Sequence, residues 1–471
     1  MVNSLKDSFE SVARVAKKLK NPCYILEEAK LQENLEILSA VKAQSGAKIL
    51  LALKGFAFWS SFKMVAKYLD GITASGYYEA RLGLEEFRKY NKKAIISVFS
   101  PAFSAPEIKK IAPFANHIIF NSFNQMQKFR AVIEKSAKGA KKPHIALRLN
   151  PLYSEVEPEI YNPCAKFSRL GIVPDEFQSG LKKYSLKGVS GLHFHTHCEQ
   201  NSDALERTLE AVERHFGKYI ADMEWINFGG GHHITRKDYD LNRLVRVISR
   251  FRKKYGVEVI LEPGEAVGWQ CGVLVGEVVD IVKNGVDIAI TNISAATQMP
   301  DCLEMPYTPE IVGAKIADNS LNSSLGTPFA LGGNFGEQQT QKSSFIPKIS
   351  SKYKTSAANT RICNLDSANQ TKIAESSLDS APKSKLQTSD TYFYRLGCPS
   401  CLAGDIIGDY EFEKPLKIGD KIIIKDMIHY TIVKNNLFNG IPLPSLAILR
   451  KDGTFKIVRK FGYNDYKKRN G

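Results

Sequence analysis

The sequence predicts a parallel (β/α)8 barrel followed by an antiparallel β-domain, an α/β plus β fold. Two observations carry this prediction. Short apolar segments alternate with stretches of helical spacing eight times between Lys48 and Glu262. Beyond residue 266 the regular helical stretches stop and longer β-like segments take over. Eight strand–helix repeats are what a closed parallel barrel requires.

Each of the eight expected barrel strands is short and rich in Ile, Val, Leu or Phe. They are Lys48–Lys54, Gly71–Ser75, Lys93–Val98, His117–Asn121, His144–Asn150, Ser190–His197, Trp225–Gly229 and Glu258–Glu262. Helical spacing follows most of them, as in Ser60–Leu69, Glu79–Tyr90 and Asp203–Tyr219. Because strand and helix alternate in this way, the strands are expected to run parallel.

We divide the chain into a lead-in with a helix (1–22), the barrel (23–266) and the β-domain (267–471). The window 315–390 is rich in Ser, Thr and Asn and lacks sustained periodicity, which predicts a disordered or loosely structured insertion. The β-like segments on either side of it predict an antiparallel sheet. They are Cys271–Val282, Val286–Ser294, Tyr392–Gly397, Lys421–Lys425, Tyr430–Val433 and Leu446–Arg459.

The formal net charge is +16, from 65 Lys and Arg against 49 Asp and Glu. The basic residues fall mostly on expected outer helices and on the tail Lys467–Arg469, so we expect a solvated basic surface and no nucleic-acid partner. No apolar signal region and no run of 18 apolar residues is visible, so no membrane association is expected. Eight scattered cysteines do not form a disulfide framework, which predicts a cytoplasmic protein with reduced thiols.

The chemically unusual residues all lie at or near the C-terminal ends of the expected strands. That end is the active-site face of such barrels, so the chain is predicted to be an enzyme. Lys54 ends the first strand, where it is either a lysine that extends its amine to water or a Schiff-base lysine near a carbonyl cofactor. The others are Arg148, His195, Gly229, Gly230, Gly231 and Glu262.

Three histidines, His193, His195 and His197, alternate along one strand and therefore share a face. Such a face resembles a metal site. The alternative is that one histidine packs on a ligand while the others fill polar gaps. The other strand ends carry no carboxylate-rich motif of a metal-dependent hydrolase, so we expect no metal.

The glycine triplet Gly229–Gly231 follows the seventh strand, where barrels often bind phosphate through backbone amides. Glu262 ends the eighth strand, where it either forms a salt bridge or holds a protonated ring nitrogen. A phosphate site, a ring-stacking histidine, an acid for a pyridinium and a Schiff-base lysine together indicate pyridoxal 5′-phosphate.

The chain resembles the alanine racemase-like, ornithine/diaminopimelate decarboxylase group of pyridoxal-phosphate enzymes (fold type III). Within that group it is most similar to the carboxynorspermidine/carboxyspermidine decarboxylases. The resemblance spans nearly the whole chain except 315–390. Its motifs are Ala52-Leu-Lys54, His195-Thr-His197-Cys198-Glu199, Phe228-Gly-Gly-Gly-His-His-Ile-Thr235, Glu262-Pro-Gly-Glu-Ala266, Cys401-Leu-Ala-Gly-Asp405 and Asn436-Leu-Phe-Asn-Gly440.

The resemblance implies a role for each matched residue. Lys54 would form the Schiff base and Cys401, from the second subunit of a homodimer with active sites at its interface, would reprotonate the substrate carbon. The remaining implied roles concern the cofactor and the interface: His195 stacks on the ring, Arg148 supports His195, Glu262 pairs with the ring nitrogen, Gly229–Gly231 and Tyr430 hold the phosphate, and Asp405 is a neighbouring interface acid.

Departures from the wider group indicate the substrate. Diaminopimelate decarboxylases carry Glu-Ser after the catalytic cysteine, where this chain has Leu402-Ala403, a pair that cannot grip a distal amino-acid end. Glu265 stands where many relatives have an arginine near the phosphate. Asp301 and Glu304 lie where ornithine decarboxylases bind the distal ammonium. A pocket lined by acids suits a small-molecule polyamine tail.

Other interpretations remain open at the level of sequence. A diaminopimelate or basic amino acid (ornithine- or arginine-type) decarboxylase is the first. A catalytically inactive regulatory homologue is the second, although both Lys54 and Cys401 are present. A metal-dependent barrel hydrolase is the third. The pair Cys398 and Cys401 has the spacing of a redox or zinc motif, which is weak evidence when it occurs once between strands.

Overall fold

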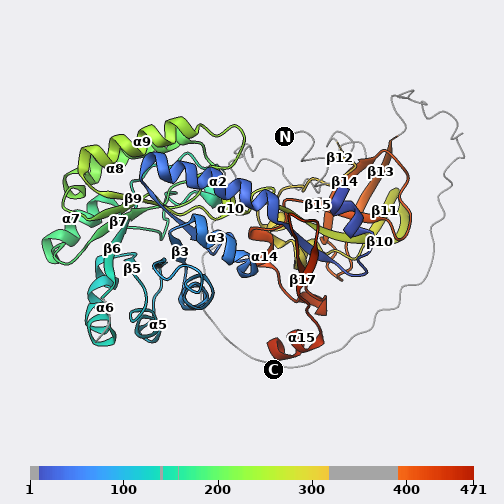
Figure 1. Cartoon of the computed structure of the whole chain (residues 1–471), viewed down its shortest axis with the longest axis horizontal. Helices are drawn as coiled ribbons and strands as arrows, with labels where there is room; N and C mark the ends of the chain where they lie inside the picture. Colours follow the sequence, from blue (N-terminus) through green and yellow to red (C-terminus); the bar gives the residue numbers. More distant parts are fainter. Residues whose placement is uncertain (1–9, 138–141, 158, 318–390) are drawn as a thin grey trace, which may run out of the picture. The chain divides into compact units, whose positions relative to one another are not determined.

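The computed structural model describes residues 10–137, 142–157, 159–317 and 391–471. The first compact part is a closed barrel of eight parallel strands (Figure 1). The strands lie where the alternation predicts them, which confirms the fold. They are β2 (Lys48–Ala52), β3 (Gly71–Ala74), β4 (Ile95–Ser100), β5 (His117–Phe120), β6 (His144–Leu149), β7 (Gly191–Phe194), β8 (Trp225–Asn227) and β9 (Glu258–Leu261).

Helices follow the strands around the barrel. Local sequence fixes several of their ends: Ser104 and Glu107 form a reciprocal capping box at the start of α5, and Gly256 ends α9 in the left-handed conformation. The helices are α2 (Glu28–Ser45), α3 (Phe62–Tyr68), α4 (Tyr77–Leu82), α5 (Ala105–Ile111), α6 (Phe123–Ser136), α7 (Pro174–Lys183), α8 (Ser202–Ile220), α9 (Leu241–Tyr255) and the short α10 (Glu265–Gly268).

The barrel strands bury both of their faces. Side chains such as Ile49 and Leu51 join the large apolar cluster that includes the helices. Because side chains alternate along a strand, the residues between them point into the barrel. Five such residues form a separate cluster that fills the interior below the site: Leu50, Ile119, Ala146, Trp225 and Ile260.

The second part is a nine-stranded, mostly antiparallel sheet with the order β12-β14-β13-β11-β10-β1-β16-β17, in which β15 also pairs with β10. Two pairs are parallel, β1 with β16 and β11 with β13. The strands are β1 (Cys23–Glu27), β10 (Gly272–Asn284), β11 (Val286–Thr291), β12 (Ala314–Ile316), β13 (Tyr392–Gly397), β14 (Ile406–Phe412), β15 (Lys421–Lys425), β16 (Ser445–Leu449) and β17 (Phe455–Arg459).

The sheet differs from the sequence prediction in three places. β1 lies within the range assigned to the barrel, 23–266, but pairs with β10 and β16 in the sheet. The expected strand Tyr430–Val433 is the helix α14 (Tyr430–Lys434), so that prediction was wrong. The expected segment Leu446–Arg459 is a hairpin, in which β16 turns at Asp452 and Gly453 into β17.

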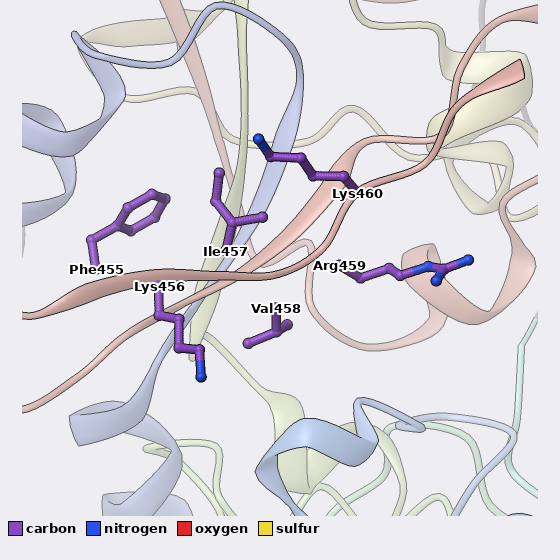
Figure 2. A pocket seen from close by; sticks show the side chains of 6 residues that line it. All are labelled: Phe455, Lys456, Ile457, Val458, Arg459 and Lys460. Carbon is purple, nitrogen blue, oxygen red and sulfur yellow. The ribbon is translucent and has the colours of Figure 1, made fainter.

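The lead-in packs on one face of this sheet. Residues 10–16 are helical, and Val12 and Ala16 join a buried cluster with residues of β1, β10, β15 and β16. Figure 2 shows the edge strand β17, whose side chains alternate: Phe455 and Ile457 pack toward this cluster, while Val458 packs toward the main core. Period-2 alternation therefore extends to the edge of the sheet.

Strands β12 and β13 bracket the window 315–390. β12 includes Lys315 and Ile316, and residues 318–390 lie outside the described residues. Both strands pair antiparallel with β14, where Ala314 and Tyr392 both align with Phe412. The two chain segments that enter and leave the window are thus separated by a single strand. Among the described residues, no helix has both the length and the apolar character that crossing a membrane demands.

Candidate active site

Lys54 lies in the turn that follows β2, at the C-terminal end of the barrel, and its side chain is exposed. Its positive charge acts on His195, Glu79 and Tyr430. Tyr430 begins α14 in the β-domain. Burial raises the pKa of its phenol, and the neighbouring Lys54 ammonium opposes that rise. The structure therefore brings together Lys54 and Tyr430, two residues that are 376 positions apart by subtraction of their numbers.

Glu262 follows β9 and is buried. Its Oε1 accepts a hydrogen bond from Asn227 Nδ2 at 2.7 Å, and its Oε2 lies 3.4 Å from His193 Nε2. Burial alone would raise the pKa of Glu262, but the hydrogen bonds from His193 and Asn227 outweigh it and the pKa is lowered. Glu262 is therefore held as a carboxylate beneath the C-terminal rim of the barrel.

His195 follows β7 and is fixed by the glycine loop. The backbone amide of Gly230 donates to His195 Nδ1 at 2.8 Å. Burial, with added repulsion from Lys54 and Arg148, lowers the pKa of His195 well below its ordinary value. The ring is therefore neutral, and because Nδ1 accepts, its proton is on Nε2.

Arg148, on β6, supports this histidine from below. Its Nη2 donates to the carbonyl oxygen of His195 at 3.3 Å, and its guanidinium lies over the ring of Phe99, 4.6 Å from the centroid. Burial lowers the pKa of Arg148 to about 10, so it stays charged at neutral pH. Phe99 also stacks on His193, with ring centroids 5.7 Å apart. Sequence reasoning did not identify Phe99, which is one of several apolar strand residues with no distinguishing pattern.

The glycine triplet after β8 is required by close backbone packing. Gly229 and Gly231 have positive φ, and a Cβ on Gly231 would lie 2.0 Å from the carbonyl oxygen of His197. The Gly229 amide donates to Asn227 Oδ1 at 2.8 Å, and the Gly230 amide is taken by His195. Two of the three amides that sequence reasoning assigned to phosphate therefore already have partners in the protein.

His197 and His232 form a second buried pair, with ring centroids 4.8 Å apart. His197 Nδ1 lies 2.9 Å from Gln200 Oε1, and burial lowers the pKa of His197 to about 4. Both rings are therefore neutral. In the ranges that the structure describes, we find no group of three or more His, Cys, Asp or Glu arranged to hold a metal ion.

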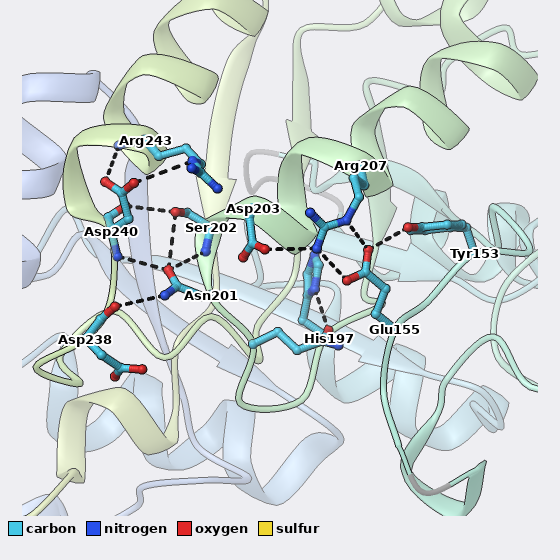
Figure 3. Close-up of polar contacts among 11 residues, drawn as sticks. Tyr153, Glu155, His197, Asn201, Ser202, Asp203, Arg207, Asp238, Asp240 and Arg243 are labelled. Carbon is cyan, nitrogen blue, oxygen red and sulfur yellow. Dashed lines mark hydrogen bonds and ion pairs between the residues drawn. The ribbon is translucent and has the colours of Figure 1, made fainter.

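A polar network secures the loops around the site (Figure 3). Asn201 caps α8 and accepts from the amides of Ser202 and Asp240, at 2.7 and 2.9 Å. Arg207 on α8 forms two bonds of 2.6 Å with Glu155 and a third of 3.0 Å with Asp203. The loop after β6 is thus tied to the helix that follows β7.

A group of acids lies beside the Lys54 site. His429 is buried, with Nδ1 3.9 Å from Glu265 Oε1 and Nε2 3.2 Å from Asp426 Oδ1. Burial alone would lower the pKa of His429, but these carboxylates and Asp301 raise it to about 9. Burial, together with Glu199, Asp426 and Asp301 and against the charge of His429, raises the pKa of Glu265 to about 7. Negative charge is concentrated here in a region of low exposure.

Asp301 belongs to this group, whereas Glu304 does not. Asp301, on α12 (Pro300–Glu304), is buried, and its charge acts on both Glu265 and His429. Glu304 is exposed at the end of the same helix and forms an ion pair with Lys434. The structure therefore brings Asp301, but not Glu304, into the acid group.

Cys401 and Asp405 follow β13 in the sheet. Cys401 is exposed, and the bonds of the Lys54 site among the described residues include none from it. Asp405 is buried, and its carboxylate accepts from Ser294 Oγ at 2.7 Å and from the Ala296 amide at 2.8 Å. Within this chain Asp405 secures the start of α11 (Ala295–Gln298) and is not directed at the Lys54 site.

The residues around Lys54 fit an anionic, carbonyl-bearing aromatic group. Arg148 Nε and His193 Nδ1 are buried polar atoms without a hydrogen-bond partner among the described residues, beside a neutral histidine ring and an ionised carboxylate. Buried polar groups are normally hydrogen-bonded, so such atoms favour a polar ligand in this region.

Known proteins that resemble this chain over nearly its whole length are decarboxylases. No family model matches the chain. A carboxynorspermidine/carboxyspermidine decarboxylase of Campylobacter jejuni is 41% identical over 96% of this chain and 99% of its own length. A carboxyaminopropylagmatine decarboxylase of Synechocystis is 35% identical and covers 96% of each chain. The crystal structure of carboxynorspermidine decarboxylase from Campylobacter jejuni, complexed with norspermidine, is 40% identical, has a TM-score of 0.74 and covers 96% of this chain and 100% of that one.

Proposed function

The chain belongs to the carboxynorspermidine/carboxyspermidine decarboxylase family, and from this premise we propose that it decarboxylates carboxynorspermidine or carboxyspermidine with pyridoxal 5′-phosphate. It is a carboxy-lyase of fold type III, whose barrel and sheet match those of its relatives. The observation that carries the proposal is a single arrangement: Lys54, neutral His195 and ionised Glu262 lie beside an acid group that contains the half-buried Glu265 and the buried Asp301.

The residues around Lys54 have the chemistry to hold this cofactor. Lys54 supplies the amine for the aldehyde, and neutral His195 offers a flat, uncharged ring face. Glu262 supplies a carboxylate for the ring nitrogen, which His193 and Asn227 keep ionised. Tyr430 lies close enough to Lys54 to contribute to the phosphate site.

Pyridoxal 5′-phosphate, when bound, supplies an electron-withdrawing ring that accepts the electron pair released as CO2 leaves. The protein residues set the conditions for this step. Glu262 must be ionised to keep the ring nitrogen protonated, and the buried setting of His193 and Asn227 maintains that state. Arg148 donates a hydrogen bond to the backbone carbonyl oxygen of His195. This bond fixes the backbone at His195 and so helps to hold the imidazole ring in one position.

The acid group favours a polycationic substrate. Glu265 and Asp301 form no ion pair with a lysine or arginine in the described part of the chain, and His429 is their nearby cation. Buried carboxylates without full compensation bind cations strongly. A polyamine supplies such cations, whereas the distal carboxylate of diaminopimelate would be repelled by Glu265 and Asp301.

A second candidate is carboxyaminopropylagmatine, because the relative named for that activity is 35% identical over 96% of this chain. Its agmatine end carries a guanidinium in place of an amine, and both are cations that carboxylates bind.

The carboxynorspermidine and carboxyspermidine substrates differ from one another by one methylene, which is worth about 1–3 kcal/mol of discrimination.

We further propose a homodimer with its active sites at the interface. Cys401 is exposed on one chain, which agrees with a role in the site of another subunit. Leu402 next to it is 46% exposed, and Phe167, in the loop after β6, is 91% exposed at positive φ. In the proposed dimer, a partner subunit would bury these two exposed apolar side chains.

We propose a cytoplasmic location from the state of the cysteines. The seven cysteines that the structure describes are unpaired, and reduced thiols are typical of the cytoplasm.

The inactive-homologue interpretation predicts loss of a catalytic group, whereas Lys54 and Cys401 are both retained.

The test is turnover of purified holoprotein on a matched set of substrates: carboxynorspermidine, carboxyspermidine, carboxyaminopropylagmatine, meso-diaminopimelate and ornithine. We expect the highest kcat/KM on one of the first two, measured by amine product. Glu265→Gln and Asp301→Asn should raise the KM for the preferred substrate more than they lower kcat. Preference for meso-diaminopimelate or ornithine, or no turnover by a fully loaded enzyme, would contradict the proposal.

A further inference from the structure

The carboxylate of Asp301 is held from one side only. Its Oδ2 accepts two hydrogen bonds, from Tyr307 OH at 2.6 Å and from Thr431 Oγ1 at 2.9 Å. Its Oδ1 is buried and has no hydrogen-bond partner among the described residues. Asp301 itself is 2% exposed. One oxygen of this buried carboxylate is thus held by two hydrogen bonds, while the other has no partner among the described residues.

Both donors are neutral hydroxyls, so they fix the carboxylate without cancelling its charge. Burial is the main cause that raises the pKa of Tyr307, and Cys302 and Asp301 raise it further, so the phenol stays protonated and donates. A lysine or arginine in the same place would neutralise Asp301. The charge of Asp301, which among the described residues is balanced in part by His429, instead adds to that of Glu265, whose pKa it helps to raise.

Thr431 connects this carboxylate to the Lys54 site. It lies on α14 directly after Tyr430, whose phenol is next to Lys54. α14 packs against α12, which carries Asp301. The orientation of Asp301 is therefore set by the same short helix that supplies a neighbour of the reacting lysine.

We propose that Tyr307 and Thr431 are positioning residues that fix Asp301 Oδ2 and thereby direct Oδ1 toward an ammonium group of the polyamine substrate. This inference rests on the proposed function and extends it to two residues that do not touch the reacting atoms. Loss of either hydroxyl lets the carboxylate rotate, so it weakens binding of the polyamine and leaves the chemical step largely intact.

The experiment compares Tyr307→Phe, Thr431→Val and the double variant with Asp301→Asn, using carboxynorspermidine for kinetics and norspermidine for calorimetric binding. We expect each single change to raise KM and the norspermidine Kd about five- to tenfold, since hydrogen bonds to charged groups are the stronger ones, with kcat within about twofold. The double variant should approach Asp301→Asn. Thr431→Ser retains the hydroxyl and should restore both constants.

Tyr161→Phe is the matched control. Tyr161 OH donates to the carbonyl oxygen of Glu304 at 2.7 Å, at the end of the same helix, without touching Asp301. It should lower stability at most and leave KM unchanged. A purely structural role for Tyr307 and Thr431 would shift Tm in all variants without the KM increase, and that result overturns the inference.

The same measurements distinguish failure of the positioning role from failure of the proposed function. If Asp301→Asn raises KM and Kd while Tyr307→Phe and Thr431→Val leave both at wild-type values, the positioning role is wrong and the proposed function stands. If the wild-type holoprotein neither binds norspermidine nor turns over carboxynorspermidine, the proposed function fails, and the positioning role fails with it.

Discussion

The amide of Gly230 donates to Nδ1 of His195 at 2.8 Å, and this bond determines which nitrogen of the neutral ring carries the proton. An imidazole that accepts at Nδ1 carries its proton on Nε2, and burial keeps it neutral. The glycine loop therefore acts on the proposed cofactor site through His195, in addition to any contact with a phosphate. The effect of the glycine loop on His195 can therefore be tested separately from any binding of phosphate by the loop.

Gly230→Ala should weaken cofactor binding. Its Cβ would lie 2.4 Å from the carbonyl oxygen of Glu262 and 3.3 Å from the His195 ring, so the loop must shift and the amide–Nδ1 bond is lost. We expect the Kd for pyridoxal 5′-phosphate to rise at least about tenfold, or ~1.4 kcal/mol, in an absorbance titration. Gly462→Ala, where a Cβ meets nothing within 4 Å, is the control. Equal affinities of the two variants would contradict the argument.

Lys54→Ala should abolish the visible absorption of the lysine-linked cofactor. Lys54 lies at the C-terminal end of β2 with its charge near His195 and Tyr430. Borohydride reduction followed by peptide mass spectrometry should place the modification on Lys54. Lys63→Ala, an exposed lysine of α3, should retain the band. A reduced protein labelled at another lysine would remove Lys54 from the proposed site.

Cys401 is predicted to act across the subunit interface. Cys401→Ala should bind the cofactor normally and turn over slowly, because the thiol that would return a proton to the substrate carbon is removed. Mixing inactive Lys54→Ala and Cys401→Ala subunits should recover about a quarter of wild-type activity, since half of the random dimers are mixed and each has one intact site. If exchange is proven by mass spectrometry and no activity returns, Cys401 acts within its own subunit or not at all.

The sequence predicted the barrel well because strand and helix periodicities are local properties. Strand ends and the residues after them, including Lys54 and Glu262, follow directly from that register. β1 could not be assigned in this way. Its five residues are all buried, as in a barrel strand, and only pairing with β10 and with β16, more than 400 positions away, places it in the sheet.

Contacts between residues far apart in the sequence explain why the strand predicted at Tyr430–Val433 was wrong and how two of the predicted acids are held. Tyr430-Thr-Ile-Val has the β-branched composition of a strand, but the burial of Thr431 and its bond to Asp301 favour a helical turn. The roles of Asp405 as an interface acid and of Glu304 as a substrate acid stay predictions. Within this chain Asp405 accepts from Ser294 and Ala296, and Glu304 pairs with Lys434, contacts that no local pattern reveals.

The stability of the protein should depend on His429 in a pH-dependent way. Burial alone would lower its pKa, but Asp426, Glu265 and Asp301 outweigh burial and raise it from 6.5 to about 9. A raised folded pKa contributes stability that is complete below about pH 6.5 and is lost as pH rises through about 9. We therefore expect the free energy of unfolding of wild type, relative to His429→Gln, to fall between pH 6.5 and 9.5.

Urea unfolding of both proteins at several pH values measures this difference. The pKa of Glu265 in the folded protein is about 7, so its contribution to the free energy of unfolding changes with pH mainly below pH 7. The measurements above pH 7 therefore report mainly on His429. A difference that stays constant from pH 6.5 to 9.5 would show that His429 is not charged in the folded protein.

Removing residues 320–385 and joining the ends with a short linker should preserve folding and activity. Ile316, the last residue of β12, aligns with Tyr410 on β14, and Tyr392, the first residue of β13, aligns with Phe412, so the two anchors lie two strand spacings apart across the sheet and two residues apart along it, roughly 12 Å. A linker of a few residues covers that distance without straining the sheet. Circular dichroism, cofactor absorbance and kcat/KM should match those of the full chain. The matched control deletes the same window and also Ala314–Ile316, which removes β12 and exposes an edge of β14; it should lower Tm. A loss of activity beyond about tenfold, or ~1.4 kcal/mol, in the first deletion alone would show that the window contributes to the site.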